Sequence, residues 1–487
     1  MTSSDQHHDR RWLILAILGI AQLMVVLDAT IVNIALPSAQ KDLGFGDGDR
    51  QWIVTAYALA FGSLLLLGGR IGDLFGRKWV FIAGLLGFAV ASAIGGAAQS
   101  FGMLVTARAA QGVFGALLAP AALSLLATTF TDPSERNKAF GVFGAIAGSG
   151  AAVGMLLGGV LTETLDWRWC LYVNLVFAVV AAVGAFLYMV NQTHPDKARL
   201  DIPGTITASA GLFALVYGFS HAEQSSWGDA TTLGFLIGGV VLLAAFVAIQ
   251  QRVKHPLLPL RVVLNRDRGG AYLAMGLSAI AMFGVFLFLT FYLQQTLGFT
   301  PIQTGLAFLP MSFVIMVSAT LAQTRLLPRF GARPLLGAGL TLGAVGMVLL
   351  TGIGVDSSYW THVLPGLLIM GIGLGNVFAP AISSATLGVD PADAGVASAT
   401  VNVMQQVGGS IGTALLSTLA ASATTSAIID AGGRPTAEVV AQAAVHGYTT
   451  AFYWSAAIFA VAAVICTALI RPGVHEPSTV GEPVLAH

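Results

Sequence analysis

The chain has 487 residues, of which 56% are hydrophobic and only 9% are charged. A soluble domain carries about 25% charged residues, so this composition excludes the soluble classes and indicates a polytopic membrane protein. Lysine plus arginine and aspartate plus glutamate balance at 23 each, which gives no reason to expect a nucleic-acid partner. The two cysteines, Cys170 and Cys466, lie in apolar runs without metal-like neighbours, and we expect buried thiols and no metal site.

Apolar runs long enough to cross a bilayer follow one another along the chain, separated by short polar segments. A spanning helix needs about 20 apolar residues, and fourteen such runs can be counted. The seventh is the shortest and contains Pro203 and Gly204. The predicted fold class is therefore an all-α polytopic membrane protein with 14 transmembrane helices. The predicted spans are 12–36, 52–69, 79–98, 102–128, 139–162, 169–190, 202–219, 231–250, 271–296, 304–324, 334–354, 361–388, 396–421 and 447–470.

The basic residues predict the orientation of these spans. With the N-terminus inside, 18 of the 23 lysines and arginines fall in cytoplasmic segments and four fall in outer loops. Cytoplasmic loops carry the excess of basic residues in membrane proteins. We therefore expect a multi-pass protein of the cell membrane with both termini in the cytoplasm and the connection from Ala421 to His446 outside.

Short internal matches indicate a duplicated unit of six helices. The segment 115–120 (GALLAP) resembles 375–380 (GNVFAP), 75–77 resembles 330–333, and 43–45 resembles 297–299, at offsets of 254 to 260 residues. The two copies leave spans seven and eight as an insertion between them. The predicted domains are an N-terminal six-helix bundle (1–191), two inserted helices with a linker (192–262), a C-terminal six-helix bundle (263–475) and a cytoplasmic tail (476–487).

Two charges lie at membrane depth, Asp28 in the first span and Arg108 in the fourth. A charge at the centre of a membrane helix is costly and usually faces the bundle interior, where it serves a function. Asp28 precedes Leu36 by eight residues and Arg108 follows Gly102 by six, which places both about 9 to 12 Å from the outer ends of their helices. We expect the two side chains to face one cavity, directly or through water.

Several segments resemble the signatures of one family. Residues 69–78 (GRIGDLFGRK) resemble the loop motif between the second and third helices of the major facilitator superfamily. Residues 27–37 (LDATIVNIALP) resemble the first-helix signature of its fourteen-helix drug–proton antiporter branch, and 108–112 (RAAQG) fit the fourth-helix motif. One departure is Met155, which stands where the fifth-helix antiporter motif has proline. Further matches lie at 167–174, 292–295 and 395–409.

This resemblance implies the major facilitator fold, with two six-helix bundles plus two inserted helices. It also implies a secondary transporter that exports drugs or antibiotics in exchange for protons. Asp28 would carry the proton, because desolvation makes protonation of a carboxylate switchable, and Arg108 would hold it ionised or bind an anionic part of the substrate. The loop motif would act as a gate between the two halves, and its residues are Gly69, Gly72, Asp73, Gly76, Arg77 and Lys78.

Polar and aromatic residues at helical spacing are candidates for a substrate cavity. Polar stripes in membrane helices also serve as contacts between helices, and aromatic residues can face lipid, so both alternatives stay open. Glycines at every fourth position of the fifth helix, Gly150, Gly154 and Gly158, permit close helix packing or a sliding contact between the halves. The cavity candidates are Asn33, Tyr57, Gln111, Phe286, Tyr292, Gln294, Asn402, Gln405 and Gln406.

Two other functions are alternatives to export. A proton-coupled importer of a small metabolite fits the same fold, and transport direction would separate the two. An intramembrane enzyme would need paired acids, a metal cluster or an activated nucleophile at membrane depth, and the sequence offers none of these. The expected partners are a small hydrophobic or amphiphilic substrate, protons and lipid, with a monomeric chain and no cofactor beyond the proton gradient.

Overall fold

The computed structural model describes residues 3–45, 47–191, 201–254, 256–390, 393–431 and 436–473. Within these ranges the side chains of residues 3–9, 33, 37, 47–51, 147–149, 151–152, 223–224 and 301 are not described. The side chain of the cavity candidate Asn33 and the whole predicted tail 476–487 therefore lie outside the described part of the structure. All regular structure in the described part of the chain is helical.

The first half of the chain forms six long helices. They are α1 (Ser3–Leu43), α2 (Asp47–Phe75), α3 (Arg77–Gly96), α4 (Phe101–Thr129), α5 (Pro133–Thr164) and α6 (Trp169–Tyr188). Side chains at the helix starts accept bonds from the free backbone N–H groups of the first turn. Ser100 accepts from Met103 N at the start of α4, and Asp132 accepts from Glu135 N at the start of α5.

An inserted pair follows, α7 (Ile202–Gln224) and α8 (Ala230–Gln250), and a short helix α9 (Leu260–Val263) leads onward. The helix α7 is longer than the predicted span 202–219. Asp201 caps it by accepting from Gly204 N, and Pro203 lies in its first turn, where its missing N–H is harmless. The prolines and glycines of this segment therefore start a helix and do not shorten it.

The second half contains the remaining helices, several of them interrupted by single π-helical segments. They are α10 (Arg266–Gly284), η1 (Val285–Leu289), η2 (Tyr292–Thr296), α11 (Pro301–Leu321), η3 (Ala322–Leu326), α12 (Leu327–Phe330), α13 (Ala332–Leu350), η4 (Tyr359–Val363), α14 (Leu364–Thr386), α15 (Ala394–Asp430) and α16 (Ala437–Leu469). In the described residues, thirteen helices are long and apolar enough to cross a membrane. The 32-residue α5 is the fourteenth long helix, in agreement with the predicted number.

The internal matches found in the sequence coincide with matched backbone geometry. Gly76 before α3 and Gly331 before α13 have φ values of 95° and 77°, and Gly44 and Gly298 have 69° and 71°. These are left-handed conformations that glycine adopts without the steric cost of a Cβ atom. The two copies therefore turn in the same way at the same two places.

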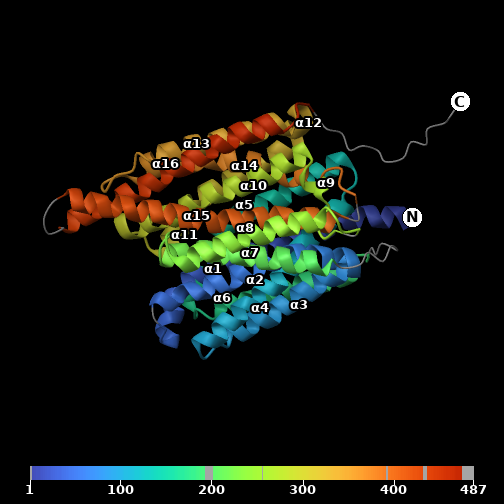
Figure 1. Ribbon diagram of the computed structural model, residues 1–487, viewed down its shortest axis with the longest axis horizontal. Helices are drawn as coiled ribbons and strands as arrows, with labels where there is room; N and C mark the ends of the chain where they lie inside the picture. The colour runs from blue at the N-terminus through green and yellow to red at the C-terminus, as the bar shows by residue number, and fades with distance from the viewer. Residues whose placement is uncertain are drawn as a thin grey trace.

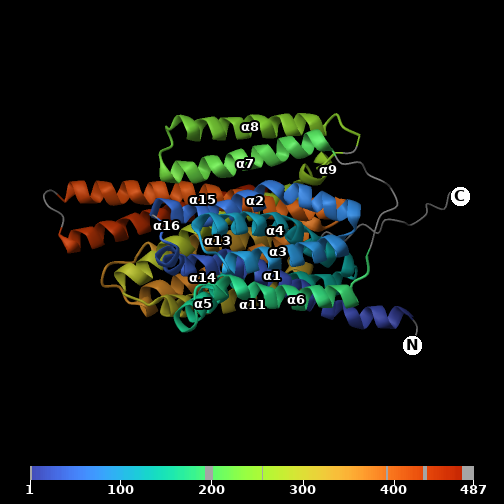
Figure 2. The same ribbon diagram turned by 90° about the horizontal axis from the view of Figure 1, so that it is seen from below.

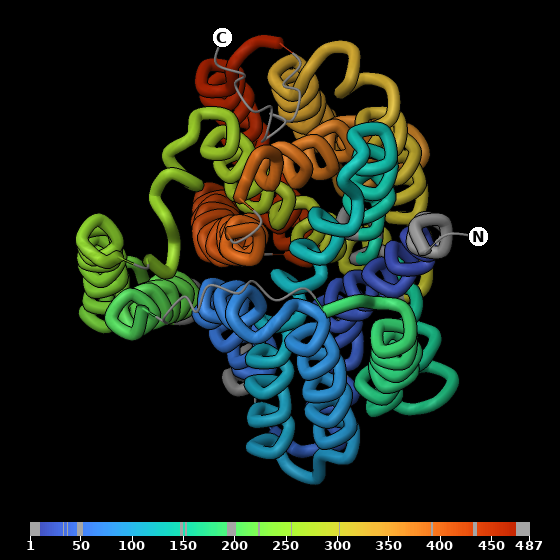
Figure 3. Tube along the Cα trace, turned by 90° about the vertical axis from the view of Figure 1, so that its right-hand side faces the viewer, coloured from blue at the N-terminus to red at the C-terminus, as the bar shows by residue number. Residues whose placement is uncertain are grey.

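The helices run side by side along the long axis of the molecule, with the start of α1 and the end of α16 at the same end (Figure 1). We call this the terminal end and the opposite one the far end. The α7–α8 pair lies outside the two halves and packs on α2 and α15 (Figures 2 and 3). The helix α5 packs on α1 of its own half and on α11 and α14 of the other half.

Candidate functional site

The two charges at membrane depth form a direct ion pair. The Arg108 Nη1 atom lies 2.6 Å from the Asp28 Oδ2 atom, and the side chains are 1% and 0% exposed. The helices α1 and α4 carry these residues, 80 positions apart in the chain. A buried pair of this kind is tolerated only when hydrogen bonds satisfy the remaining polar atoms.

Amide side chains supply those hydrogen bonds. The second carboxylate oxygen of Asp28, Oδ1, accepts from Gln111 Nε2 at 2.9 Å and from Asn174 Nδ2 at 2.7 Å. Gln111 also accepts from Arg108 Nη1 at 2.7 Å and donates to Ser92 Oγ at 2.7 Å. Three donors on one carboxylate match its ionised form, which only accepts hydrogen bonds. We call Asp28, Ser92, Arg108, Gln111 and Asn174 the carboxylate cluster.

The helix α2 closes the cluster on the guanidinium side. Arg108 Nε donates to the backbone oxygen of Ile53 at 3.3 Å, and the guanidinium carbon lies 4.5 Å from the centre of the Tyr57 ring. Tyr57 in turn stacks on Phe61, with ring centres 5.5 Å apart. The glycine Gly112 allows this approach, because a Cβ atom there would lie 2.5 Å from the Tyr57 backbone oxygen. The hydrogen bonds of Arg108 Nε and Nη1 therefore all go to residues of the N-terminal half.

The structure brings together Asp28 and Arg108, as expected from their equal depth, and adds two residues that the sequence analysis did not assign to the site. One feature of the sequence could have assigned Asn174 to the site, namely its position within the matched segment 167–174. Ser92 has no such feature, because it is a single serine in an apolar run. Each residue of the cluster is at most 1% exposed. The pair therefore lies enclosed among α1, α2, α3, α4 and α6 in this conformation.

The loop motif connects the two halves at the terminal end. Asp73 Oδ1 accepts from Arg77 Nη2 at 2.9 Å in its own half and from the backbone N–H of Gly395, at the start of α15, at 3.2 Å. Gly69 lies against Gly395 so closely that a Cβ atom on Gly69 would be 2.6 Å from the Gly395 oxygen. The helices α2 and α15 therefore meet here backbone to backbone.

The other motif residues remain within the N-terminal half. Gly76 makes the left-handed turn before α3, and a Cβ atom at Gly72 would meet nothing within 4 Å. Lys78 Nζ donates to the backbone oxygen of Phe186 in α6 at 3.0 Å. Lys78 therefore contacts its own half in this conformation, and Asp73 makes the hydrogen bond to the second half. A second contact, which the sequence did not predict, also joins the halves, from Arg136 Nη2 of α5 to Thr386 Oγ1 of α14 at 3.0 Å.

The glycines of α5 divide between two partners. Cβ atoms on Gly150, Gly154 and Gly158 would approach Val26, Thr30 and Ile31 of α1, so these three residues pack within the N-terminal half. In this conformation the contact of these glycines is thus with α1, and it is close helix packing within one half. Other small residues face the second half, namely Gly141 opposite Gln323, Gly144 opposite Ala379 and Gly159 opposite Ile302.

The cavity candidates fall in different surroundings. Tyr57 and Gln111 belong to the Asp28–Arg108 surroundings, and the Tyr292 hydroxyl donates to the Gly354 oxygen at 2.8 Å. Phe286 packs on Phe308 with ring centres 5.4 Å apart. The remaining candidates are half-buried: Gln294 on η2, and Asn402, Gln405 and Gln406 on α15. Of these, Gln406 lies against Gly62 of α2 and thus at the boundary between the halves.

Comparison with known proteins identifies the class. Residues 18–413 match the Major Facilitator Superfamily. The chain belongs to this superfamily, and it is a membrane transporter and not an enzyme.

Among its relatives, the puromycin resistance protein pur8 of Streptomyces alboniger is 51% identical over 463 residues, which cover 95% of this chain and 92% of that protein. The cephamycin export protein CmcT of Amycolatopsis lactamdurans is 39% identical over 407 residues, covering 83% and 84%. The fold is also similar to that of the human organic anion transporter MFSD10, with a TM-score of 0.63, 16% identity and coverage of 94% of this chain and 99% of that chain.

Proposed function

We propose that this protein exports a small amphiphilic antibiotic across the cell membrane in exchange for protons. The export of antibiotics is supported by the relatives, which are named as resistance and export proteins, one of them 51% identical. The exchange for protons rests on one observation, the buried Asp28–Arg108 pair inside the N-terminal half. The chain acts as a monomer, with its terminal end in the cytoplasm as the basic residues predict.

Asp28 is the proton carrier in this proposal. Protonation neutralises the carboxylate, removes its attraction for Arg108 and turns one acceptor oxygen into a donor. Breaking a buried ion pair leaves an uncompensated charge, which is strongly destabilising, so Arg108 must then take another anionic or polar partner. The helices α1 and α4 that hold the pair therefore have two arrangements, one for each protonation state of Asp28.

The contacts between the halves at the terminal end are the gate in this proposal. They include the Asp73–Gly395 and Arg136–Thr386 hydrogen bonds. Opening towards the cytoplasm breaks both, and closing restores them. A transporter of this class moves its two halves against each other around a substrate site between them. Protonation of Asp28 biases the equilibrium between the two arrangements.

The decisive test replaces the proton carrier. Asp28→Asn keeps the volume and hydrogen-bonding capacity of the side chain but cannot titrate. We expect this variant, purified and reconstituted in liposomes, to lose proton-driven export of puromycin. Its melting temperature should fall, because Arg108 stays buried without its anionic partner, but the variant should still fold and bind puromycin. Glu163→Gln is the matched control, because it removes an exposed acid at the far end of α5 and should transport normally.

Two results would contradict the proposal. Export by Asp28→Asn at a near wild-type rate under a proton gradient would show that Asp28 is not the proton carrier. Proton-driven uptake of puromycin into right-side-out vesicles would show that the protein is a proton-coupled importer and not an exporter. In inverted vesicles we expect accumulation that collapses when a protonophore is added.

A further inference from the structure

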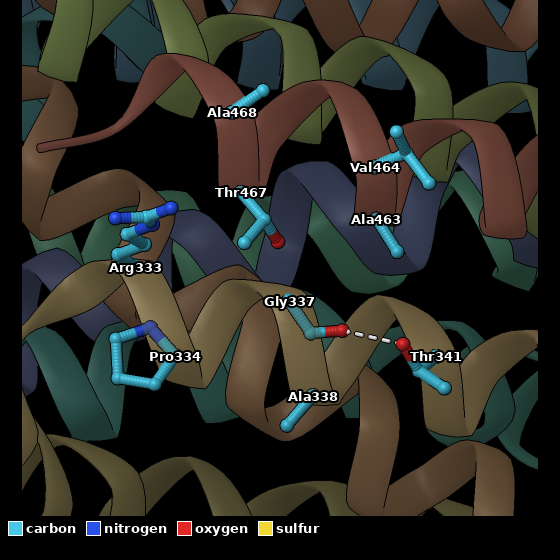
Figure 4. A pocket seen from close by; sticks show the side chains of 9 residues that line it. All are labelled: Arg333, Pro334, Gly337, Ala338, Thr341, Ala463, Val464, Thr467 and Ala468. Atoms are coloured by element: carbon cyan, nitrogen blue, oxygen red, sulfur yellow. Dashed lines mark hydrogen bonds between the residues drawn. The ribbon is translucent and has the colours of Figure 1, made fainter. Parts of the chain in front are cut away.

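A groove lies on the outer surface of the second half, between α13 and α16. Its volume is about 550 Å³, within the range of about 300–1,000 Å³ that small-molecule sites occupy. The surface around it is open, since Val464 is 71% exposed, and Pro334, Ala338, Thr341 and Ala468 are exposed as well. The lining residues are Arg333, Pro334, Gly337, Ala338, Thr341, Ala463, Val464, Thr467 and Ala468 (Figure 4).

The groove combines an apolar wall with one cation. Arg333 lies at one end of the row of lining residues, with Thr341 and Val464 at the other (Figure 4). This is the terminal end, because α13 begins there beside α12 (Figure 1). Within the described residues, the Arg333 side chain has no hydrogen bond or ion pair. A second arginine, Arg266, donates to the backbone oxygen of Ala468 at 3.2 Å and adds positive charge at this end.

In the first half, side chains fill the surface between α3 and α6 that corresponds to the groove between α13 and α16. Counting from the matched glycines Gly76 and Gly331, Arg333 of α13 corresponds to Lys78 of α3. The Lys78 ammonium group has partners, since Nζ donates to the Phe186 oxygen at 3.0 Å and lies 5.4 Å from the centre of the Trp79 ring. Trp79 and Phe186 also pack on each other, with ring centres 6.3 Å apart. Aromatic side chains thus fill the space between α3 and α6.

The second half keeps the cation and loses the side chains that fill the space. In the same register Pro334, Gly337 and Thr341 replace Trp79, Ile82 and Leu86. On the partner helix, Thr467 lies two residues before the end of α16, where Phe186 lies in α6. The cation and the open groove therefore occur together in one copy only.

We propose that this groove binds one anionic phospholipid of the cytoplasmic leaflet. The phosphate lies at Arg333, and one acyl chain follows the apolar wall between α13 and α16. An open groove between two spanning helices faces lipid, and basic pockets between such helices on the cytoplasmic side select anionic headgroups. The lipid supplies both the anion that Arg333 lacks and the apolar volume that Trp79 and Phe186 provide in the first half. The site is separate from the carboxylate cluster and does not depend on the transported substrate.

The test measures lipid binding to the purified full-length protein by native mass spectrometry in detergent. We expect one tightly held dioleoyl-phosphatidylglycerol and weaker binding of dioleoyl-phosphatidylcholine. Arg333→Gln should weaken phosphatidylglycerol binding about fivefold, the effect of one basic residue near a membrane surface. Ala338→Phe, which fills the groove, should weaken the binding of both lipids. Thr341→Leu, which restores the residue of the first half, gives a second filling variant if Ala338→Phe does not fold.

Arg329→Gln is the matched control, because Arg329 lies in the preceding helix α12, outside the groove lining, with its guanidinium carbon 5.4 Å from the centre of the Phe330 ring. Its phosphatidylglycerol binding should equal that of the wild type. Wild-type binding by Arg333→Gln, or an equal loss in Arg329→Gln, would overturn the proposal. Glycerol phosphate that binds as tightly as the lipid would overturn it too, since the site would then take a free phosphate. Melting temperatures of all variants exclude misfolding as the cause of lost binding.

Discussion

The carboxylate cluster joins four helices of one half through side chains alone. Asp28 is held by Arg108, Gln111 and Asn174, and Ser92 accepts a hydrogen bond from Gln111. A hydrogen bond to a charged group contributes about 1.5–3 kcal/mol to stability. Removing one partner of a buried hydrogen bond destabilises a protein more than replacing both partners by apolar groups, because the remaining polar group stays buried without a partner. Each amide therefore supports both the stability of the N-terminal half and the position of the proposed proton carrier.

Asn174→Ala tests this support. Loss of the Asn174 donor should lower the free energy of unfolding by about 1.5–3 kcal/mol and slow proton-driven transport, without removing the Asp28 carboxylate. Melting curves of the purified variant, with transport measured in liposomes, check both effects. Asn376→Ala is the matched control, because among the described residues the Asn376 side chain donates to the Ile372 oxygen of its own helix and to no other helix. An equal loss of stability in both variants would contradict the role of Asn174.

A second residue-scale feature fixes the far end of the N-terminal half. Arg168 Nη1 lies 2.7 Å from Asp42 Oδ2, Trp167 Nε1 donates to the same oxygen at 3.2 Å, and Arg168 Nη2 donates to the Ala98 oxygen at 3.1 Å. This explains the matched Trp-Arg-Trp segment, because its side chains join the ends of α1, α3 and α6. The hydrogen bonds from Arg168 and Trp167 hold the pKa of Asp42 below its usual value.

The sign of this pKa shift sets a pH window. A carboxyl group whose pKa is lowered by folding stabilises the protein above its unfolded value of about 3.8, and the effect is lost as the pH falls through the folded value. Asp42→Asn should therefore lower the melting temperature by the same amount at pH 5 and at pH 8. The difference from the wild type should shrink only below about pH 3.8. A difference that instead disappears between pH 8 and pH 5 would contradict the pairing, and Glu163→Gln serves as the exposed control.

At the scale of helices, glycine decides where the two halves meet. A Cβ atom on Gly144 of α5 would lie 2.7 Å from the Ala379 Cβ atom and 2.8 Å from its Cα atom in α14. Small residues let membrane helices approach backbone to backbone, and a larger side chain here must move the whole helix. The α5–α14 contact lies in the gate region beside the Arg136–Thr386 hydrogen bond.

Gly144→Val should therefore keep the terminal end from closing. We expect at least tenfold slower transport, because one of the two states of the cycle becomes strained. Cysteines at the exposed residues Lys138 and Arg329 would report a longer distance across the gate by spin labelling. Gly238→Ala is the control, since a Cβ atom on Gly238 of α8 meets nothing within 4 Å. Unchanged distances and wild-type transport in Gly144→Val would exclude this contact from the gate.

At the scale of the molecule, the two halves share a scaffold but not their charges. The offsets map Asp28 near Met282, Asp73 onto Pro328 and Arg108 onto Leu368, so the second half lacks all three charges. It retains the matched glycines and their left-handed turns. In our proposal the first half therefore couples transport to protons, and the second half supplies substrate surface and the lipid groove.

The orientation of the whole molecule is testable with single cysteines. Cys170 and Cys466 are both buried, so a cysteine placed on the surface gives a specific signal. We expect Ser426→Cys, exposed near the far end of α15, to react with an impermeant maleimide added outside intact cells. Arg329→Cys at the terminal end should react only after permeabilisation. The reverse labelling pattern would place both termini outside and invert the proposed direction of transport.

The sequence by itself determined the class of the molecule and the identity of its central pair. Span length and the cost of a charge in lipid are properties of one segment at a time, so fourteen spans, Asp28 and Arg108 could be read from it. The similar depth of Asp28 in α1 and Arg108 in α4 was sufficient to predict that their side chains lie close together. The matched glycines of the two copies were visible too, because a left-handed turn is a local requirement.

Only the tertiary structure decided which faces meet. Ser92 and Asn174 join the cluster, Gly150 packs on α1, and Lys78 turns to α6, because each contact joins segments far apart in the chain. The groove beside Arg333 is likewise a product of two helices, α13 and α16. Helix pairs in a membrane are selected by close packing and hydrogen bonds between helices, and not by hydrophobicity, which every span has in common. The pattern of apolar residues therefore fixes the spans but leaves their neighbours open.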